Sequence, residues 1–155
     1  MSGLAKDFLE QKRIAVAGVS RTPGAHGGNA VYTRLRDRGY QVFAVNPNAQ
    51  VAEGDRAYPD LRAIPGGVDA VVIATNPRHA DPIVRQCAEL GIRRVWMHGG
   101  PGPASVSPTA VEFCRANGVA VIPGGCPLMY GRASDLGHRC MRWVLERTGA
   151  VPKGI

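Results

Sequence analysis

Residues Arg13–Tyr32 decide the fold and read R-I-A-V-A-G-V-S-R-T-P-G-A-H-G-G-N-A-V-Y. The apolar run Ile14–Ala17 is short enough for a buried parallel strand, and Gly18 ends it. A loop rich in glycine and serine follows, and a helical pattern begins near Gly28. A strand, a glycine turn and a helix start, in this order, form the phosphate-binding corner of nucleotide folds. The reason is that a helix N-terminus offers unpaired N–H groups and a positive dipole end.

The loop itself offers further donors for an anion. Gly18 permits a sharp turn, and Ser20 and Arg21 can add donors aimed at phosphate. The glycines that follow are Gly24, Gly27 and Gly28, so the compact G-x-G-x-x-G spacing is absent. The alternative is a plain strand–helix connection that needs glycine only for its shape. The loop favours a nucleotide or phosphate ligand without identifying it.

Strands and helices alternate along the rest of the chain. The expected strands are Arg13–Gly18, Gln41–Asn46, Asp69–Thr75, Arg93–His98 and Val119–Ile122. The expected helices are Leu4–Gln11, Gly28–Arg38, Arg78–Leu90, Ser107–Asn117 and Ala133–Thr148. This alternation predicts an α/β fold, namely a Rossmann-type five-stranded parallel sheet in a three-layer α/β/α arrangement with an extra C-terminal helix. We expect the strand order 3-2-1-4-5 and an irregular covering segment at 49–67.

The length of 155 residues suits one domain with a single core. We expect residues 1–155 to form one domain, with an N-terminal helix in 1–12 and a C-terminal helix and tail in 131–155 packed on it. Arg38 is expected to face water, and Ser107 to cap its helix. The residues expected to pack the last helix are Leu136, Cys140, Trp143 and Val144.

Charge and composition narrow the function classes. The formal net charge of +7 suits an anionic partner, but it does not choose between nucleic acid and a small phosphorylated ligand. Basic residues are mixed with acids and aromatics are few, so no nucleic-acid surface is expected. No apolar run approaches the roughly 20 residues needed to span a membrane, and no signal-peptide pattern is present. The four cysteines are far apart without a C-x-x-C pair, which predicts a reduced, cytoplasmic protein without a metal site.

The ends of the five expected strands carry polar, glycine or proline residues. These ends are Gly18–Ser20, Asn46–Asn48, Thr75–Pro77, His98–Gly100 and Gly124–Pro127. In an open parallel sheet the ligand binds at the carboxyl ends of the strands, where the strand order reverses. An NAD site usually has an acid after the second strand, but here the first acid is Glu53. This counts against NAD and leaves NADP and coenzyme A open.

Several segments occur together in the order and near the spacing of a known family. They are G-V-S-R-T-P-G at 18–24, R-G-Y-Q-V-F-A-V-N-P at 38–47, A-Y-P-D-L at 57–61, V-W-M-H-G at 95–99 and C-P at 126–127. Over Arg13–Tyr130 the chain resembles the stand-alone CoA-binding domain proteins. Their fold is similar to the CoA-binding domain of the succinyl-CoA synthetase alpha subunit.

The resemblance implies coenzyme A or a short acyl-CoA as the ligand, with three groups of contacts. The residues that border the CoA phosphates would be Gly18, Val19, Ser20 and Arg21. The residues that meet the adenosine end would be Asn46, Pro47 and Asn48. The residues that line the pantetheine path would be Thr75, Asn76, Pro77, Met97, His98 and Gly99. The chain departs from the family pattern at Ala25-His26, where a lysine is common, and at His98, which replaces a glutamine.

Two residues are candidates for chemistry. Cys126 precedes a proline at a strand end and can serve as a nucleophile or form a mixed disulfide with CoA, but a small buried residue in a tight turn is the favoured interpretation. His98 can act as an acid, a base or a phosphate donor, or simply hydrogen-bond at the rim. The succinyl-CoA synthetase relatives perform their phosphohistidine chemistry with a second domain, which we do not expect here.

Three functions remain open from the sequence. The first is a cytoplasmic binding, carrier or regulatory protein for CoA without ligase chemistry of its own. The second is a small NADP-dependent enzyme that uses His98 or Cys126. The third is an interaction domain with an unused pocket. As partners we expect a small nucleotide ligand, together with a second copy or an unidentified partner enzyme, and neither nucleic acid nor membrane.

Overall fold

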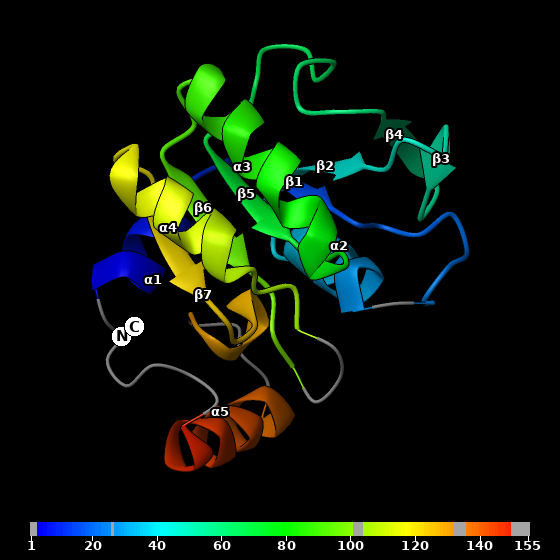
Figure 1. The fold of residues 1–155 in the computed structure, drawn as a ribbon. Helices are drawn as coiled ribbons and strands as arrows, with labels where there is room; N and C mark the ends of the chain where they lie inside the picture. The colour runs from blue at the N-terminus through cyan, green and yellow to red at the C-terminus, as the bar shows by residue number, and fades with distance from the viewer. Residues whose placement is uncertain (1–2, 26, 101–103, 132–135, 150–155) are drawn as a thin grey trace.

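The computed structural model describes residues 3–25, 27–100, 104–131 and 136–149 (Figure 1). Its helices are α1 Gly3–Leu9, α2 Gly27–Asp37, α3 Ala80–Glu89, α4 Pro108–Ala116 and α5 Leu136–Thr148, with short 3-10 turns η1 Pro77–His79 and η2 Pro127–Met129. Its strands are β1 Arg13–Ala17, β2 Gln41–Val45, β3 Val51–Ala52, β4 Asp55–Tyr58, β5 Ala70–Ile73, β6 Arg94–Met97 and β7 Ala120–Pro123. The predicted α/β class is confirmed.

The sheet differs from the prediction in strand number and strand order. Within the described residues it has seven strands in the order β3-β4-β2-β1-β5-β6-β7, all parallel except the β3–β4 pair. Counted over the five expected strands this is 2-1-3-4-5, so the predicted order 3-2-1-4-5 is wrong. The reason is that β4 pairs with the outer edge of β2, with Val45 opposite Tyr58. The third of the predicted strands, β5, therefore pairs with the free edge of β1.

The hairpin β3–β4 lies in the segment that was expected to be irregular. Its strands are only two and four residues long, which is too short to show a clear alternation of apolar and polar residues. The turn between them is Glu53-Gly54, with φ values of 50° and 81°. A two-residue turn with both φ values positive usually carries Asn-Gly or Asp-Gly. The unusual glutamate therefore hid the hairpin in the sequence.

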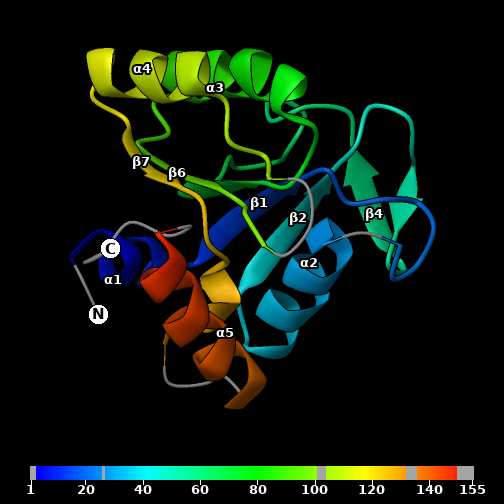
Figure 2. The ribbon, with the colours of Figure 1, turned by 60° about the horizontal axis from the view of Figure 1, so that its bottom comes forward.

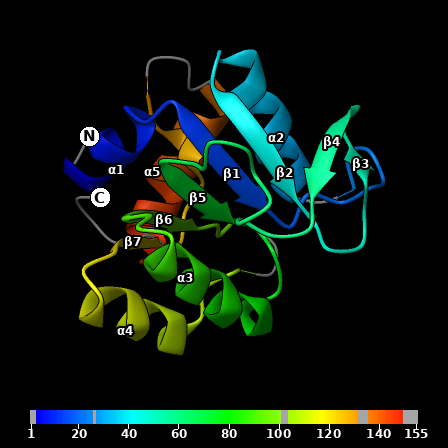
Figure 3. The ribbon, with the colours of Figure 1, turned by 90° about the horizontal axis from the view of Figure 1, so that it is seen from above.

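The elements form the expected three layers, with helices on both faces of the sheet. Figure 2 shows α3 and α4 on one face and α1, α2 and α5 on the other, and Figure 3 shows the same division from above. Each face has its own hydrophobic core. Every residue of β5 is buried, as its nearly unbroken apolar sequence predicted.

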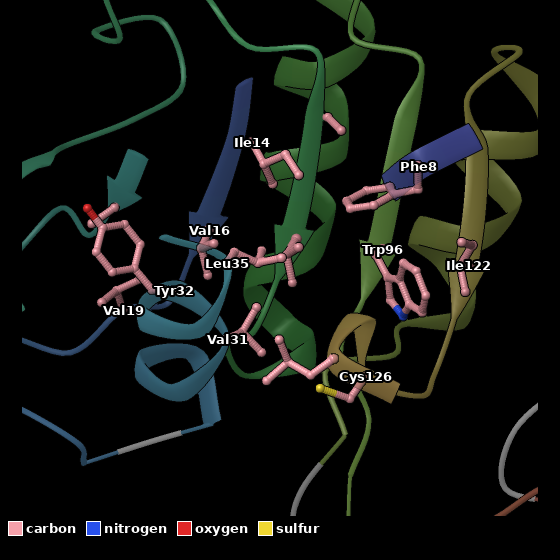
Figure 4. Close-up of a cluster of buried hydrophobic side chains, with 14 of the residues drawn as sticks. Phe8, Ile14, Val16, Val19, Val31, Tyr32, Leu35, Trp96, Ile122 and Cys126 are labelled. Carbon is pink, nitrogen blue, oxygen red and sulfur yellow. The ribbon is translucent and has the colours of Figure 1, made fainter. Parts of the chain in front are cut away.

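Trp96 is the centre of the core on the α1 face. Its indole ring packs edge-on against Phe8, with ring centroids 5.3 Å apart (Figure 4). The centroid of the Tyr130 ring also lies 5.3 Å from that of Trp96. The indole Nε1 donates a hydrogen bond of 3.0 Å to the carbonyl oxygen of Gly124. One buried side chain thus joins α1, β6 and the loop after β7.

The C-terminal helix packs through a different face from the predicted one. Trp143 and Val144 are 57% and 48% exposed, and Met141 and Leu145 contact the core instead. Cys140 is exposed as well, and the side chain of Leu136 lies outside the described residues. Met141 and Leu145, which are four residues apart, therefore form the inward face of this helix, and its largest side chain, Trp143, does not.

Arg38, which was expected to face water, is half-buried. Its guanidinium donates to the carbonyl oxygens of Leu128 and Tyr130, over 3.2 and 3.5 Å. These two carbonyls belong to η2 and the residue after it. Arg38 therefore attaches the end of α2 to the segment that leads toward α5.

Two glycines bring the start of α2 against the end of β1. Gly18 has φ of +100°, and a Cβ there would overlap the carbonyl group of Ala74. A Cβ on Gly28 would lie 2.6 Å from the carbonyl oxygen of Gly18. Only residues without a side chain allow this approach, which places the first turn of α2 beside the carboxyl ends of β1 and β5.

The close approach predicts a large effect for Gly28→Ala. The added methyl group has to push α2 away from β1, and overpacking of this kind costs about 1–3 kcal/mol of unfolding free energy. Urea denaturation followed by circular dichroism measures it. Gly3→Ala is the control, because a Cβ at Gly3 meets nothing within 4 Å and should change stability by less than about 0.5 kcal/mol. Equal stability of the two variants would contradict the proposed helix–strand contact.

Trp96→Phe tests the buried indole. The variant keeps a ring beside Phe8 but removes the donor to the Gly124 carbonyl, so we expect the free energy of unfolding to fall by about 1–3 kcal/mol in urea titrations. The exposed Trp143→Phe is a matched control with an expected change within about 0.5 kcal/mol. The account of the core is wrong if the two substitutions cost the same.

Candidate functional site

A cavity of about 520 Å³ lies at the carboxyl ends of β1, β2, β4 and β5. The predicted site residues that line it are Gly18, Ser20, Asn46, Pro47, Asn48 and Thr75. The lining residues that the sequence did not indicate are Ala17, Val45, Pro59, Asp60, Leu61, His79, Pro82, Ile83 and Gln86. Most of the latter come from the segment after β4 and from the start of α3.

The cavity lies where the topology places ligands in this kind of sheet. From β1 the chain goes first to β2 on one side and later to β5 on the other. The crevice outside this switch point is the usual ligand site of doubly wound sheets with the order 2-1-3-4-5. A second hollow of about 460 Å³ lies at the opposite end of the sheet, between Leu9, Arg38 and Tyr130. The topology favours the first cavity.

The segment after β2 is tied to the loop after β1. The Asn46 side-chain amide donates to the carbonyl oxygen of Val19 over 2.9 Å, and its Oδ1 accepts the backbone N–H of Asn48 over 2.8 Å. Asn46 thus shapes its own turn and holds the neighbouring loop. Val19 is fully buried, so it supports the site from the core and does not line the cavity.

The loop between β1 and α2 is organised by a residue that sequence reasoning missed. Asn29 is 1% exposed, and its Oδ1 accepts the backbone N–H of Ser20 over 2.9 Å. Its amide nitrogen donates to the carbonyls of Ser20 and Thr22 and to Glu53 Oε1. The Ser20 hydroxyl accepts the N–H of Thr22 over 3.1 Å. The Ser20 amide is therefore turned into the protein in this structure, and is not aimed at a ligand as we had expected.

Other donors remain at this corner. The first turn of α2, from Gly27 to Ala30, has backbone N–H groups that no helix of this kind can satisfy internally. Arg21, which belongs to the loop between β1 and α2, is exposed. Together with the helix dipole these groups favour an anion near the start of α2. His26, which was expected to lie near a phosphate, falls outside the described residues.

His98 lies against the first turn of α2. A Cβ on Gly27 would be 3.0 Å from His98 Cε1, and the backbone of His98 is fixed by bonds with Ile73 and Ser105 of 2.8 Å each. Burial lowers the pKa of His98 from its usual value, so the imidazole is neutral at pH 7. The ring lies beside the proposed anion position and is not part of the cavity lining.

The other residues expected along the pantetheine path occupy different environments. Met97 is fully buried in the core on the α3 face. Gly99 is buried too, and its N–H donates to the Gly125 carbonyl over 2.8 Å. Asn76 is exposed and its Oδ1 accepts the N–H of Arg78, which caps η1 beginning at Pro77. Only Thr75 of this group lines the cavity.

Cys126 has the environment of a packing residue. It is 6% exposed, and burial raises the pKa of its thiol to about 11. A thiol with this pKa is protonated at neutral pH and is a poor nucleophile. Among the residues that the structure describes, no group of three or more His, Cys, Asp and Glu side chains is arranged to hold a metal. None of the helices in the described part of the chain has the length and apolar character needed to span a membrane.

Known proteins with similar sequences and structures point to one family. The chain is 34% identical over 124 residues to an ADP-forming acetate–CoA ligase II of Archaeoglobus fulgidus, which covers 75% of this chain and 18% of that enzyme. It is 28% identical over 122 residues to the uncharacterized protein YneT of Bacillus subtilis, covering 78% of this chain and 87% of YneT. The chain thus spans under a fifth of the length of the ligase relatives, but most of YneT.

A hypothetical protein from Pyrococcus horikoshii OT3 has a similar structure, with a TM-score of 0.71 and 25% sequence identity, covering 79% of this chain and 84% of that one. The family model described as a CoA binding domain matches residues 12–132, which span every strand and the candidate site. The match confirms the resemblance found in the sequence. This chain belongs to the CoA-binding domain family.

Proposed function

We propose that this chain binds coenzyme A or a short acyl-CoA in the cavity at the carboxyl ends of β1, β2 and β5. The proposal rests on the agreement between the family match and the position of the cavity in the fold. The CoA-binding family match covers the whole sheet, and the cavity at its switch point is built from Gly18, Asn46–Asn48 and Thr75. The family resemblance of the sequence assigns these same residues to the ligand.

The cavity fits part of a CoA molecule in size and chemistry. Its volume of about 520 Å³ falls within the range of small-molecule sites. Leu61 and Ile83 supply apolar wall, while Asp60 and Gln86 supply polar groups, which suits a nucleoside. The diphosphate then lies toward Arg21 and the first turn of α2, where the helix dipole attracts negative charge.

The proposed role is binding, transport or regulation, without ligase chemistry of its own. Neither His98 nor Cys126 lines the cavity, and the Cys126 thiol is protonated at pH 7, so neither side chain is placed to attack a ligand there. All four cysteines are free in the structure, which is compatible with the reducing cytoplasm that we propose as its location. A second copy or a separate enzyme that receives the CoA is part of this proposal.

Thermal denaturation with different nucleotides tests the ligand. A ligand that binds only the folded state raises the melting temperature, so we expect a rise with CoA, a smaller rise with dephospho-CoA, and none with NAD. Titration calorimetry then gives the affinity. A rise with NADP and none with CoA would replace the proposal by the NADP-dependent alternative. No rise with any nucleotide would reject a nucleotide site.

Arg21→Ala tests the position of the phosphates. The exposed guanidinium is expected to donate a charge-assisted hydrogen bond, so its loss should weaken CoA binding by about tenfold in calorimetry. Arg115→Ala, which removes an exposed arginine of α4, is the control for net charge and should bind as the parent does. If Arg21→Ala retains the parental affinity, the phosphates lie elsewhere. Gly18→Val is unsuitable for this test because its side chain would overlap Ala74.

A further inference from the structure

Glu53 adopts a backbone conformation that glutamate rarely adopts. Its φ is 50°, in the left-handed region, and it is the one described residue other than glycine with positive φ. It occupies the first position of the two-residue turn between β3 and β4, where asparagine, aspartate or glycine is preferred. A strained residue of this kind persists only where contacts with its surroundings hold it in place.

The Glu53 carboxylate holds the loop between β1 and α2 at its far end. Oε1 accepts the backbone N–H of Gly24 over 2.8 Å and the side-chain amide of Asn29 over 2.7 Å. These two bonds lower the pKa of Glu53, that from Gly24 most, so the carboxylate is ionised at neutral pH. Hydrogen bonds to an ionised acceptor are the stronger kind.

Asn29 continues this network to the near end of the loop. Its Oδ1 accepts the N–H of Ser20, and its amide nitrogen donates to the carbonyl oxygens of Ser20 and Thr22. Since Asn29 is 1% exposed, no water can easily replace these bonds. The shape of the loop from Ser20 to Gly24 is therefore fixed by two side chains, one in α2 and one in the hairpin turn.

The hairpin that carries Glu53 is itself attached to α2. Asp55 accepts the Tyr32 hydroxyl over 2.8 Å and the Arg36 guanidinium over 2.6 Å. Arg36 donates in addition to the backbone carbonyl of Glu53 over 2.9 Å. Figure 3 shows the hairpin beside α2 and the loop that follows β1. The strained turn is thus connected to the same helix whose first turn faces the proposed phosphate position.

We propose that Glu53 is a positioning residue of the ligand site. It holds the β1–α2 loop in the shape that places Arg21 and the first turn of α2 around the ligand phosphates. The inference rests on the proposed function for its ligand, and on the contacts of Glu53 for its mechanism. The carboxylate also occupies the Gly24 N–H, so the phosphates bind nearer to the start of α2 than to the tip of the loop.

Two substitutions separate this role from a purely structural one. Glu53→Gly removes the carboxylate but relieves the left-handed strain, because glycine adopts positive φ without cost. Glu53→Gln keeps one acceptor oxygen and removes the charge. Glu112→Gln removes an exposed carboxylate from α4 and serves as the matched control. Calorimetry with CoA, thermal denaturation and the ¹H–¹⁵N spectrum are measured for all three and for the parent.

We expect Glu53→Gly to bind CoA about tenfold more weakly while its melting temperature falls only slightly, since the relieved strain offsets part of the cost of losing two hydrogen bonds and of the greater freedom of the unfolded chain. Glu53→Gln should lose less, and Glu112→Gln nothing. The amide signal of Gly24 should shift in both Glu53 variants. Parental CoA affinity in Glu53→Gly overturns the inference, as does a loss of affinity that only accompanies a large fall in melting temperature.

Amide hydrogen exchange separates failure of this inference from failure of the proposed function. If the parent does not bind CoA, the CoA proposal fails, and the exchange rates of Ser20 and Gly24 then decide the role of Glu53. Faster exchange at both amides in Glu53→Gly supports its hold on the loop. Unchanged exchange rates overturn it.

Discussion

The contact between α2 and the end of β1 is the constraint on which the remaining structure depends. It exists because neither Gly18 nor Gly28 has a side chain, so the helix can begin directly against the carbonyl of the strand. The same contact brings the positive end of α2 to the edge of the sheet between β2 and β5. A helix start, a switch in strand order and a cavity therefore coincide at one place, within the residues that match the CoA binding domain, and this is where we propose the ligand site.

Much of the fold follows from local patterns in the sequence. The strand at 69–75 that contains β5, the Ser107 cap of α4 and the alternation of elements were all predicted and are present. The strand order was predicted wrongly, because it depends on which edge of β2 is already paired with another strand. That edge is covered by β4, whose hairpin has two short strands and a Glu-Gly turn that no common turn pattern signals.

Some residues of the candidate site could likewise be predicted from the sequence, and others could not. The strand ends at Gly18, Asn46 and Thr75 could be found because parallel strands end on one edge, and each lines the cavity. Met97 could not be excluded from sequence, since facing the core or the ligand depends on the exact end of β6. Asn29 and Glu53 were missed because the partners of their side chains lie seven to 29 residues away in the chain. The one signal that the sequence offered was the asparagine at the start of the predicted helix, Asn29.

The most direct measurement is a crystal structure of this chain with coenzyme A. The account predicts diphosphate density within hydrogen-bond distance of the backbone N–H groups of Gly27 and Gly28, with the adenosine in the cavity beside Asn46 and Ile83. The Ser20 amide should still donate to Asn29. Diphosphate density at the amino ends of the strands, beside Arg38 and Tyr40, would contradict the central claim that the start of α2 binds the ligand.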